Sequence, residues 1–209
     1  MSGQRSIGDI MRLSPVIPVL VLHDASDARV IAESLVAGGL RVLEVTLRTP
    51  AALEVVREMR KVEGAVVGCG TVLNEAHVDA AAEAGAEFLV SPGLTPSVGK
   101  AALRGGLPLL PGVATPTELM AGIEMGLSHF KFFPAEASGG VSGLQALAAP
   151  FAEARFCPTG GVTEQSVPDW LAIPQVLCVG GTWLVPRGPV DPTAIRAAAE
   201  RASSFARSA

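Results

Sequence analysis

Eight short apolar, strand-like runs recur along this 209-residue chain at intervals of roughly 20 to 26 residues. This repeat constrains the fold more than any other feature of the sequence. Alanine-rich amphipathic stretches lie between the runs, and glycine often ends them, as at Gly85 and Gly126. Because a glycine just past a helix end readily adopts the left-handed conformation, the pattern predicts alternating strands and helices. The runs begin near Val16, Val42, Val66, Phe88, Pro108, Phe130, Arg155 and Val176.

Apolar strands that alternate with helices predict a parallel sheet covered by helices, and eight such units predict a (β/α)8 TIM barrel. A doubly wound open sheet is the alternative fold. We expect residues 1–209 to form a single barrel domain, with residues 1–13 as an N-terminal helical extension that closes the bottom of the barrel. The predicted helices cover residues 28–37, 51–61, 76–84, 96–104, 117–125 and 143–148, with two more after Val162 and Pro192.

Composition narrows the classes of function. The chain is 49% hydrophobic and 17% charged, which suits a packed core and not a disordered chain. A net charge of −4 argues against nucleic-acid and acidic-membrane partners. No apolar run approaches the roughly 18 residues of a spanning helix, and the apolar residues 16–22 are predicted to form the first strand, not a signal peptide. We therefore expect a cytoplasmic protein.

Cysteine and histidine do not have the spacing of a metal site. Cys69, Cys157 and Cys178 contain no CxxC pair and are interpreted as small buried hydrophobic residues. The three histidines lack HxH or HxxxH spacing. We expect neither a metal nor a cofactor.

Lys131 stands in an unusual setting, the apolar strand-like run of residues 129–134. The other two lysines, Lys61 and Lys100, lie in polar, helix-like stretches. Burial of an ammonium group is costly and favours the neutral amine, which can form a Schiff base with a ketone, as a guanidinium cannot. The alternative is a lysine at a strand end that reaches water or pairs with an acid.

Glu44 is the acid that we expect to pair with Lys131, because it lies inside another apolar strand, residues 42–48. Glu44, Thr46 and Arg48 have the same parity and should face one side of a regular strand. The pair could simply hold the barrel interior together, but buried ion pairs are weak stabilisers. A glutamate and a lysine in one strand layer therefore indicate a functional site.

Two glycine pairs flanked by threonine end the last two predicted strands, Thr159-Gly160-Gly161 and Gly180-Gly181-Thr182. Paired glycines expose backbone N–H groups, and the threonine hydroxyls add donors. Phosphate groups commonly bind at this position of a TIM barrel. The sequence contains no Walker motif and no GxGxxG fingerprint.

Together these strand ends resemble the 2-keto-3-deoxy-6-phosphogluconate (KDPG) and 4-hydroxy-2-oxoglutarate (KHG) aldolase family, over residues 16–186. The resemblance implies a class I aldolase on a (β/α)8 barrel that uses no metal, acts in the Entner–Doudoroff pathway and forms a homotrimer. The chain departs from the family at Thr182, where we expect serine in many members of the family. The matching motifs are Val42-Leu-Glu-Val-Thr-Leu-Arg-Thr49, Gly70-Thr-Val-Leu73, Ser91-Pro-Gly-Leu94, Phe130-Lys-Phe-Phe-Pro-Ala-Glu136, Phe156-Cys-Pro-Thr-Gly-Gly161 and Gly180-Gly-Thr-Trp-Leu-Val185.

The resemblance also implies residue roles, with Lys131 as the Schiff-base lysine and Glu44 as the general acid/base. The chain has no tyrosine, so Glu44 is the evident group to move protons. Phe132 and His129 are expected to be structural. The residues that would bind substrate are Arg48 and Thr71 (the pyruvate carboxylate), Pro92 and Phe133 (the pocket wall), Thr159, and Gly160, Gly161, Gly181 and Thr182 (the phosphate).

The expected reaction is cleavage of KDPG to pyruvate and glyceraldehyde 3-phosphate, and also cleavage of 4-hydroxy-2-oxoglutarate to pyruvate and glyoxylate. The alternatives are an aldolase for the galactonate epimer of KDPG, a phosphosugar epimerase, and a non-catalytic barrel that binds a phosphorylated ligand. Apart from its own copies in a homotrimer, the chain is expected to bind only a small phosphorylated keto acid, and neither nucleic acid nor membrane.

Overall fold

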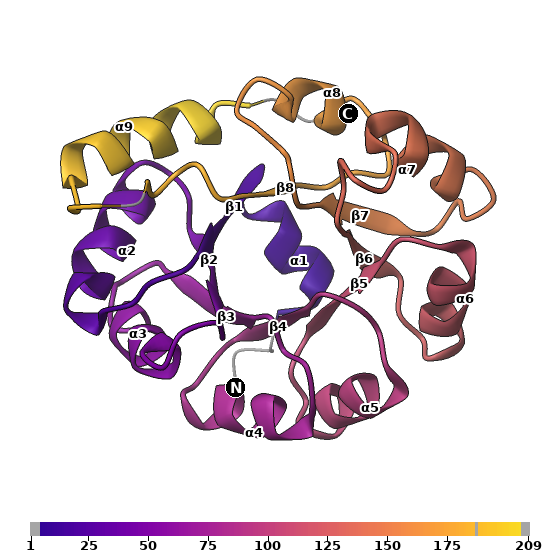
Figure 1. Ribbon diagram of the computed structural model, residues 1–209, viewed down its shortest axis with the longest axis horizontal. Helices are drawn as coiled ribbons and strands as arrows, with labels where there is room; N and C mark the ends of the chain where they lie inside the picture. The colour runs from indigo at the N-terminus through magenta and orange to yellow at the C-terminus, as the bar shows by residue number, and fades with distance from the viewer. Residues whose placement is uncertain (1–4, 187, 206–209) are drawn as a thin grey trace.

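Eight parallel strands form the centre of the molecule and helices surround them (Figure 1). The computed structural model describes residues 5–186 and 188–205. The strands are β1 (Val16–Leu20), β2 (Val42–Thr46), β3 (Val66–Gly70), β4 (Phe88–Ser91), β5 (Leu109–Val113), β6 (His129–Phe132), β7 (Arg155–Pro158) and β8 (Val179–Gly181).

The helices follow the strands in the predicted alternation, after one helix that precedes β1. A short 3-10 helix, η1 (Ala25–Asp27), leads into α2. The α-helices are α1 (Ile7–Arg12), α2 (Ala28–Ala37), α3 (Ala52–Met59), α4 (Glu75–Glu83), α5 (Pro96–Arg104), α6 (Pro116–Glu124), α7 (Gly140–Ala148), α8 (Val167–Leu171) and α9 (Pro192–Ser203).

The sheet closes into a barrel. Strands pair in the order β7-β6-β5-β4-β3-β2-β1-β8, and every pair is parallel. Single bridges from Phe156 to Val176 and from Thr159 to Gly180 then join β7 to the β8 segment. The (β/α)8 prediction is confirmed and the doubly wound open sheet is wrong, because an open sheet leaves two unpaired edges.

Element boundaries depart from the sequence prediction by a few residues. The last strand was expected from Val176, but its ladder to β1 begins at Val179, and Val176 contributes only the single bridge to Phe156. Helix α7 begins at Gly140, three residues before the predicted start, because the sequence Gly-Gly reads as a loop. Such shifts depend on tertiary pairing that local sequence does not encode.

Helix α1 closes one end of the barrel. A capping box formed by Ser6 and Asp9 starts this helix, and Ile10 and Met11 are buried among residues that line the barrel interior, including Ile17 and Phe88. Figure 1 shows α1 lying across the ring of strands. The predicted N-terminal helix is therefore present, and the part of it predicted over residues 1–4 lies outside the described residues.

Alternate strand residues divide the core into two layers. In β6, for example, Phe130 and Phe132 pack outward against the helices, where the Phe132 ring lies 6.3 Å from that of Trp170. Cys157 and Cys178 face the barrel interior, and Cys69 faces the helices. All three cysteines are buried as predicted, and burial raises the pKa of the Cys69 thiol to about 12. Among the described helices, none is long and apolar enough to cross a membrane.

His129 links α1 to β6 and has the structural role expected of it. The ring is half-buried, and its Nε2 has no hydrogen-bond partner among the described residues. A Cβ atom built on Gly8 of α1 would lie 2.6 Å from this Nε2, so the helix packs directly on the ring. Burial lowers the pKa of His129 below 6.5, and the positive charges of Arg12 and Arg155 lower it further, while Asp9 opposes them.

This lowered pKa predicts a loss of stability in mild acid. Below about pH 6.5, His129 is protonated in the unfolded chain but stays neutral in the native protein. The free energy of unfolding therefore decreases as the pH falls, until the pH reaches the lowered native pKa. Urea unfolding measured between about pH 7.5 and pH 5 should therefore show a steeper loss for the wild type than for His129→Gln. The exposed His23 provides the matched control, and His23→Gln should keep the wild-type slope. Equal slopes for wild type and His129→Gln would contradict the assignment.

Candidate active site

A lysine and a glutamate meet inside the barrel. Lys131 reaches inward from β6 and Glu44 from β2, and the Lys131 Nζ atom donates to Glu44 Oε1 at 3.1 Å and to Oε2 at 3.4 Å. The two residues are only 5% and 3% exposed. Desolvation of both charges offsets most of their attraction. A buried ion pair of this kind therefore adds little to the stability of the fold.

Glycines lie on the strands next to those of Glu44 and Lys131. A Cβ atom built on Gly70 would lie 2.2 Å from Glu44 Oε1, so an alanine there would displace the carboxylate. Gly112 pairs with Lys131 in the β5–β6 register, and a Cβ on Gly112 would lie 2.2 Å from the Pro92 carbonyl oxygen. Gly70 thus leaves room for the Glu44 carboxylate, and Gly112 leaves room for the Pro92 backbone.

The Phe133 ring lies beside Lys131, and the Pro92 backbone packs against the next strand. The Lys131 Nζ atom is 5.3 Å from the centre of the Phe133 ring, within the range of a cation–π contact. The Pro92 carbonyl is packed against Gly112, the register partner of Lys131. Both residues are half-buried. The structure therefore brings Phe133 next to the lysine, and Pro92 next to the register partner of the lysine.

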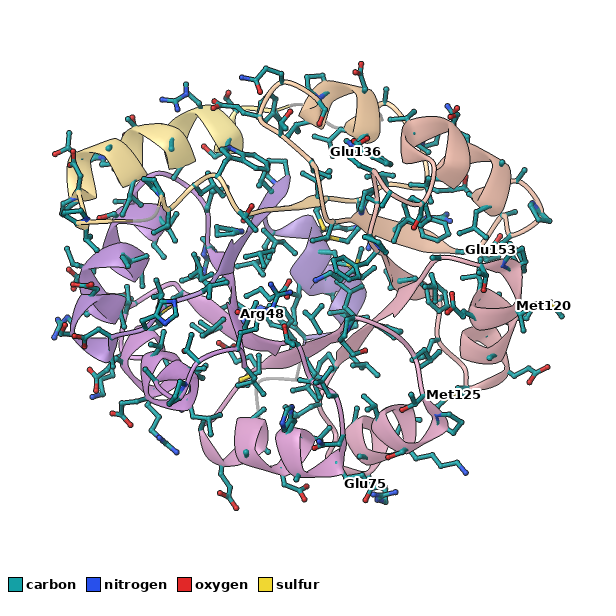
Figure 2. The ribbon with its side chains drawn as sticks, viewed as in Figure 1. Arg48, Glu75, Met120, Met125, Glu136 and Glu153 are labelled. Atoms are coloured by element: carbon teal, nitrogen blue, oxygen red, sulfur yellow. The ribbon has the colours of Figure 1, made fainter. Side chains whose placement is uncertain are left out.

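Arg48 reaches the site by a different route from the one predicted. Regular strand geometry ends at Thr46, whose hydroxyl donates to the Leu20 carbonyl at 2.9 Å, and Arg48 follows in a turn. The expectation that Glu44, Thr46 and Arg48 share one face assumed a regular strand, so it does not apply to Arg48. Figure 2 nevertheless shows Arg48 over the middle of the barrel. Its Nε atom donates to the Thr71 hydroxyl at 3.1 Å.

Thr71 has a strained backbone that serves this contact. Its φ of +59° lies in the left-handed region, and it is the one non-glycine residue with positive φ in the described chain. Such a conformation costs about 1 to 3 kcal/mol and occurs mainly at functional sites. The exposed Arg48 guanidinium, held by Thr71, is a planar donor suited to a carboxylate.

The glycine pair after β7 presents unpaired backbone amides. Gly160 and Gly161 have φ values of +96° and +82°. The N–H groups of Gly161 and Val162 have no hydrogen-bond acceptor within the described part of the chain. Successive free amides in a left-handed turn form an anion-binding concavity. Thr159, at the same strand end, is 4% exposed.

The second glycine pair lies beside the first. Thr159 bridges to Gly180, and a Cβ on Gly180 would lie 2.3 Å from the Thr159 hydroxyl oxygen. Gly181 is covered by the Trp183 ring, since a Cβ there would lie 2.0 Å from Cζ3 of that ring. Thr182 is exposed, and its hydroxyl has no partner in residues 5–186 and 188–205. The two predicted pairs thus lie side by side at the ends of β7 and β8.

Backbone hydrogen bonds join the loop after β6, the strand of Lys131, to the Gly160–Gly161 loop. After β6, the Ala135 N–H donates to the Thr159 carbonyl at 2.8 Å, and the Glu136 N–H donates to the Gly160 carbonyl at 3.0 Å. The loop that follows Lys131 is therefore fixed to the Gly160–Gly161 loop. Glu136 lies within one of the quoted motifs, but sequence reasoning gave it no role, because an exposed glutamate reads as an ordinary solvated residue.

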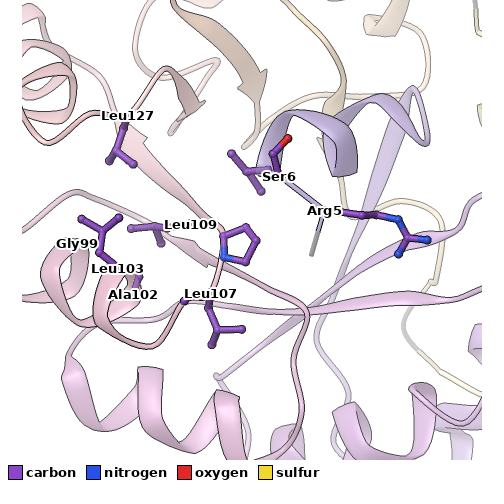
Figure 3. A pocket seen from close by; sticks show the side chains of 11 residues that line it. Arg5, Ser6, Gly99, Ala102, Leu103, Leu107, Leu109 and Leu127 are labelled. Carbon is purple, nitrogen blue, oxygen red and sulfur yellow. The ribbon is translucent and has the colours of Figure 1, made fainter. Parts of the chain in front are cut away.

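The apolar cavity in Figure 3 lies at the other end of the barrel. It has a volume of about 330 Å³ and is lined by the N-terminal segment, α5 and the start of β5. Aliphatic side chains such as Leu103, Leu109 and Leu127 dominate the lining. The cavity contains none of the predicted site residues, so it is separate from the lysine–glutamate centre.

The arrangement suits a specific kind of ligand. A buried amine can add to a ketone, a carboxylate 3.1 Å away can move a proton, and an arginine at the mouth can bind an acid group. The free amides on the other side suit a phosphate. These features together fit a keto acid that carries a phosphate at its far end.

Comparisons with known proteins agree with this chemistry. Residues 7–197 match the family model described as "Aldolase: KDPG and KHG aldolase". The chain is 56% identical to the 2-dehydro-3-deoxy-phosphogluconate aldolase of Zymomonas mobilis, over 98% of this chain and 99% of that protein. It is 53% identical to the KHG/KDPG aldolase of Escherichia coli, over 89% and 88%.

Solved structures give the same result. The KDPG aldolase of Zymomonas mobilis with 3-phosphoglycerate superposes with a TM-score of 0.96 at 56% identity, and each chain is 98% covered. A KDPG aldolase from Legionella pneumophila, with pyruvate captured as a covalent carbinolamine intermediate, has a TM-score of 0.91 at 41% identity and covers 94% of this chain. In that comparison 98% of the Legionella chain is covered.

Proposed function

Because the chain belongs to the KDPG and KHG aldolase family, we propose that Lys131 and Glu44 carry out the chemistry of this family as Schiff-base lysine and general acid/base. The chain is a carbon–carbon lyase that cleaves KDPG to pyruvate and glyceraldehyde 3-phosphate, a reaction of the Entner–Doudoroff pathway. One observation carries the residue assignment: the Lys131 amine is buried 3.1 Å from the Glu44 carboxylate.

Lys131 begins the reaction. Its neutral amine adds to the C2 ketone of the substrate to give a carbinolamine, and loss of water gives a protonated imine. A carbinolamine with pyruvate is named for the related Legionella enzyme, which supports this step. The imine then acts as the electron acceptor for bond cleavage. A neighbouring carboxylate stabilises this cation, which explains why Glu44 lies so close.

Glu44 moves the protons. It accepts the proton of the C4 hydroxyl group while the C3–C4 bond breaks, and the electron pair of that bond shifts toward the imine nitrogen to form an enamine. Glyceraldehyde 3-phosphate leaves as the aldehyde. Glu44 then returns the proton to C3, and water hydrolyses the new imine to release pyruvate and regenerate the Lys131 amine.

The rest of the site holds the two ends of the substrate. Arg48, held by Thr71, binds the carboxylate next to the ketone. Phe133 and Pro92 line the pocket beside the lysine, and Thr159 contacts the substrate between its two ends. Four further residues bind the phosphate through backbone amides and a hydroxyl group: Gly160, Gly161, Gly181 and Thr182.

Three broader properties complete the proposal. We propose that residues 1–209 act as one catalytic domain, because every site residue lies in a strand of one sheet or within three residues of its end. We propose a homotrimer, as the family resemblance implies, with exposed apolar side chains on outer helices, such as Leu103, Met120 and Ile123, as candidate contact residues. We also propose a cytoplasmic location, where phosphorylated sugar acids are metabolised.

Replacement of the glutamate tests the proton-transfer role. Glu44→Gln should keep imine formation with pyruvate measurable, because Lys131 is intact, but should slow turnover by about 100-fold or more. Exchange of solvent deuterium into the methyl group of pyruvate, followed by NMR, should fall in parallel. Glu153→Gln, at an exposed site, serves as the control. Near-normal exchange in Glu44→Gln would assign the proton transfer to another group.

Replacement of Thr182 tests the phosphate site. Thr182→Val keeps the shape of the side chain but removes the hydroxyl, so kcat/KM for KDPG should fall by about tenfold, the scale of one lost hydrogen bond to a charged group. The value for 4-hydroxy-2-oxoglutarate, which has no phosphate and should be the poorer substrate, should stay nearly constant. The C4 epimer of KDPG, the galactonate analogue, belongs in the same assay.

A helix-surface threonine provides the control for this experiment. Thr193→Val in α9 should change neither substrate. Equal kcat/KM values of the wild type for the phosphorylated and unphosphorylated substrates would contradict the phosphate site, while leaving the lyase activity intact. Release of pyruvate as the product separates this reaction from that of a phosphosugar epimerase.

A further inference from the structure

Glu136 packs against the glycine loop in a way that its exposure does not suggest. The residue is exposed, and its carboxylate has no ion pair or hydrogen bond with another described residue. A Cβ atom built on Gly161 would nevertheless lie 2.6 Å from Glu136 Cβ and 2.5 Å from Glu136 Cγ. Figure 2 shows Glu136 near α7 and α8, on the side of the barrel where β7 and β8 lie. The aliphatic part of the side chain therefore covers Gly161 directly.

The Glu136 backbone is held by a hydrogen bond, and its carboxylate lies beside a helix N-terminus. Its backbone N–H donates to the Gly160 carbonyl at 3.0 Å. Its carboxylate lies beside the start of α7, where a Cβ on Gly140 would lie 3.4 Å from Oε2. Helix α7 has no side-chain cap and no acid in its first turn, so the position suits a negative charge. The side chain thus spans the distance from Gly161 to the N-terminus of α7.

The glycine loop needs such support. Gly160 and Gly161 are consecutive left-handed residues with no side chains of their own to fix them. Glycine has the largest conformational freedom of any residue, and ordering it costs the most entropy. Amides that are already aimed at a ligand bind it more tightly than amides that must first be ordered. A side chain packed on Gly161 reduces that freedom before the ligand arrives.

We propose that Glu136 is a positioning residue for phosphate recognition, and that its aliphatic stem, not its charge, holds the Gly160–Gly161 loop in the binding conformation. A carboxylate close to a bound phosphate would repel it, so the charge itself gives no attraction. Its place at the start of α7 directs that charge to the helix N-terminus instead. This inference rests on the proposed phosphate site and extends it to a residue that does not touch the ligand.

Two substitutions at Glu136 separate the stem from the charge. Glu136→Ala removes the stem, and KM for KDPG should rise by about tenfold with little change in kcat, the effect of losing loop order worth about 1.4 kcal/mol. Glu136→Gln keeps the stem and removes the charge, and should stay within about twofold of wild type, as for an ordinary surface change. Inorganic phosphate should inhibit the wild type and Glu136→Gln competitively, and Glu136→Ala about tenfold more weakly.

The second substrate distinguishes positioning from general damage. The kcat/KM for 4-hydroxy-2-oxoglutarate should stay within about twofold in both variants, which also shows that they are folded. Glu153→Ala, at an exposed glutamate labelled in Figure 2 and remote from the glycine loop, is the matched control and should change neither substrate.

Several results would overturn the proposal. If Glu136→Ala lowered kcat/KM equally for KDPG and for 4-hydroxy-2-oxoglutarate, Glu136 would have only a general structural role. A changed KM for KDPG in Glu136→Gln would assign the effect to charge. A Glu136→Ala variant with normal KM would refute the inference alone, provided the wild type still prefers the phosphorylated substrate. A wild type without that preference would refute the phosphate site and this inference together.

Discussion

The amine of Lys131 and the carboxylate of Glu44 lie 3.1 Å apart in the barrel interior. The other residues of the candidate site lie around this pair, at the carboxyl ends of the strands. Such a pair adds little net stability, because desolvation offsets the attraction between the charges. Space for it comes from Gly70, which leaves room for the Glu44 carboxylate. Gly112, next to Lys131 in the sheet, leaves room for the Pro92 backbone. The barrel thus leaves out a side chain at Gly70 to hold the two groups that we propose to react.

At the opposite end of the barrel, closed by α1, buried apolar side chains stabilise the fold. Helix α1 fills that end, and Ile10 and Met11 complete an apolar cluster with the first residues of several strands. The loops at the catalytic end are instead joined by backbone hydrogen bonds, from Ala135 to Thr159 and from Glu136 to Gly160. These bonds connect the strand that carries Lys131 to the amides proposed for phosphate binding. The same backbone hydrogen bonds therefore fix the distance between Lys131 and the Gly160–Gly161 loop.

Part of this arrangement could be predicted from the sequence. Strands begin at Val42, Val66 and Phe88 as expected, because apolar runs bounded by glycine are a local signal. Lys131 was identifiable because a lysine in an apolar strand is unusual. The Arg48–Thr71 contact was not predictable from strand parity, since Thr71 adopts a left-handed conformation that threonine normally avoids. The packing of Glu136 on Gly161 was also hidden, because it depends on the distance between two loops.

The covalent role of Lys131 is the central claim, and trapping the imine tests it most directly. The enzyme is incubated with pyruvate and sodium borohydride, which reduces an imine to a stable amine, and the modified peptide is identified by mass spectrometry. The account predicts one carboxyethyl group, on Lys131 and on neither Lys61 nor Lys100, with loss of KDPG cleavage in proportion to labelling. Lys131→Arg should remain unlabelled and inactive, because a guanidinium does not form the imine. Labelling of Lys61 or Lys100 instead, or inactivation without an adduct on Lys131, would contradict the account.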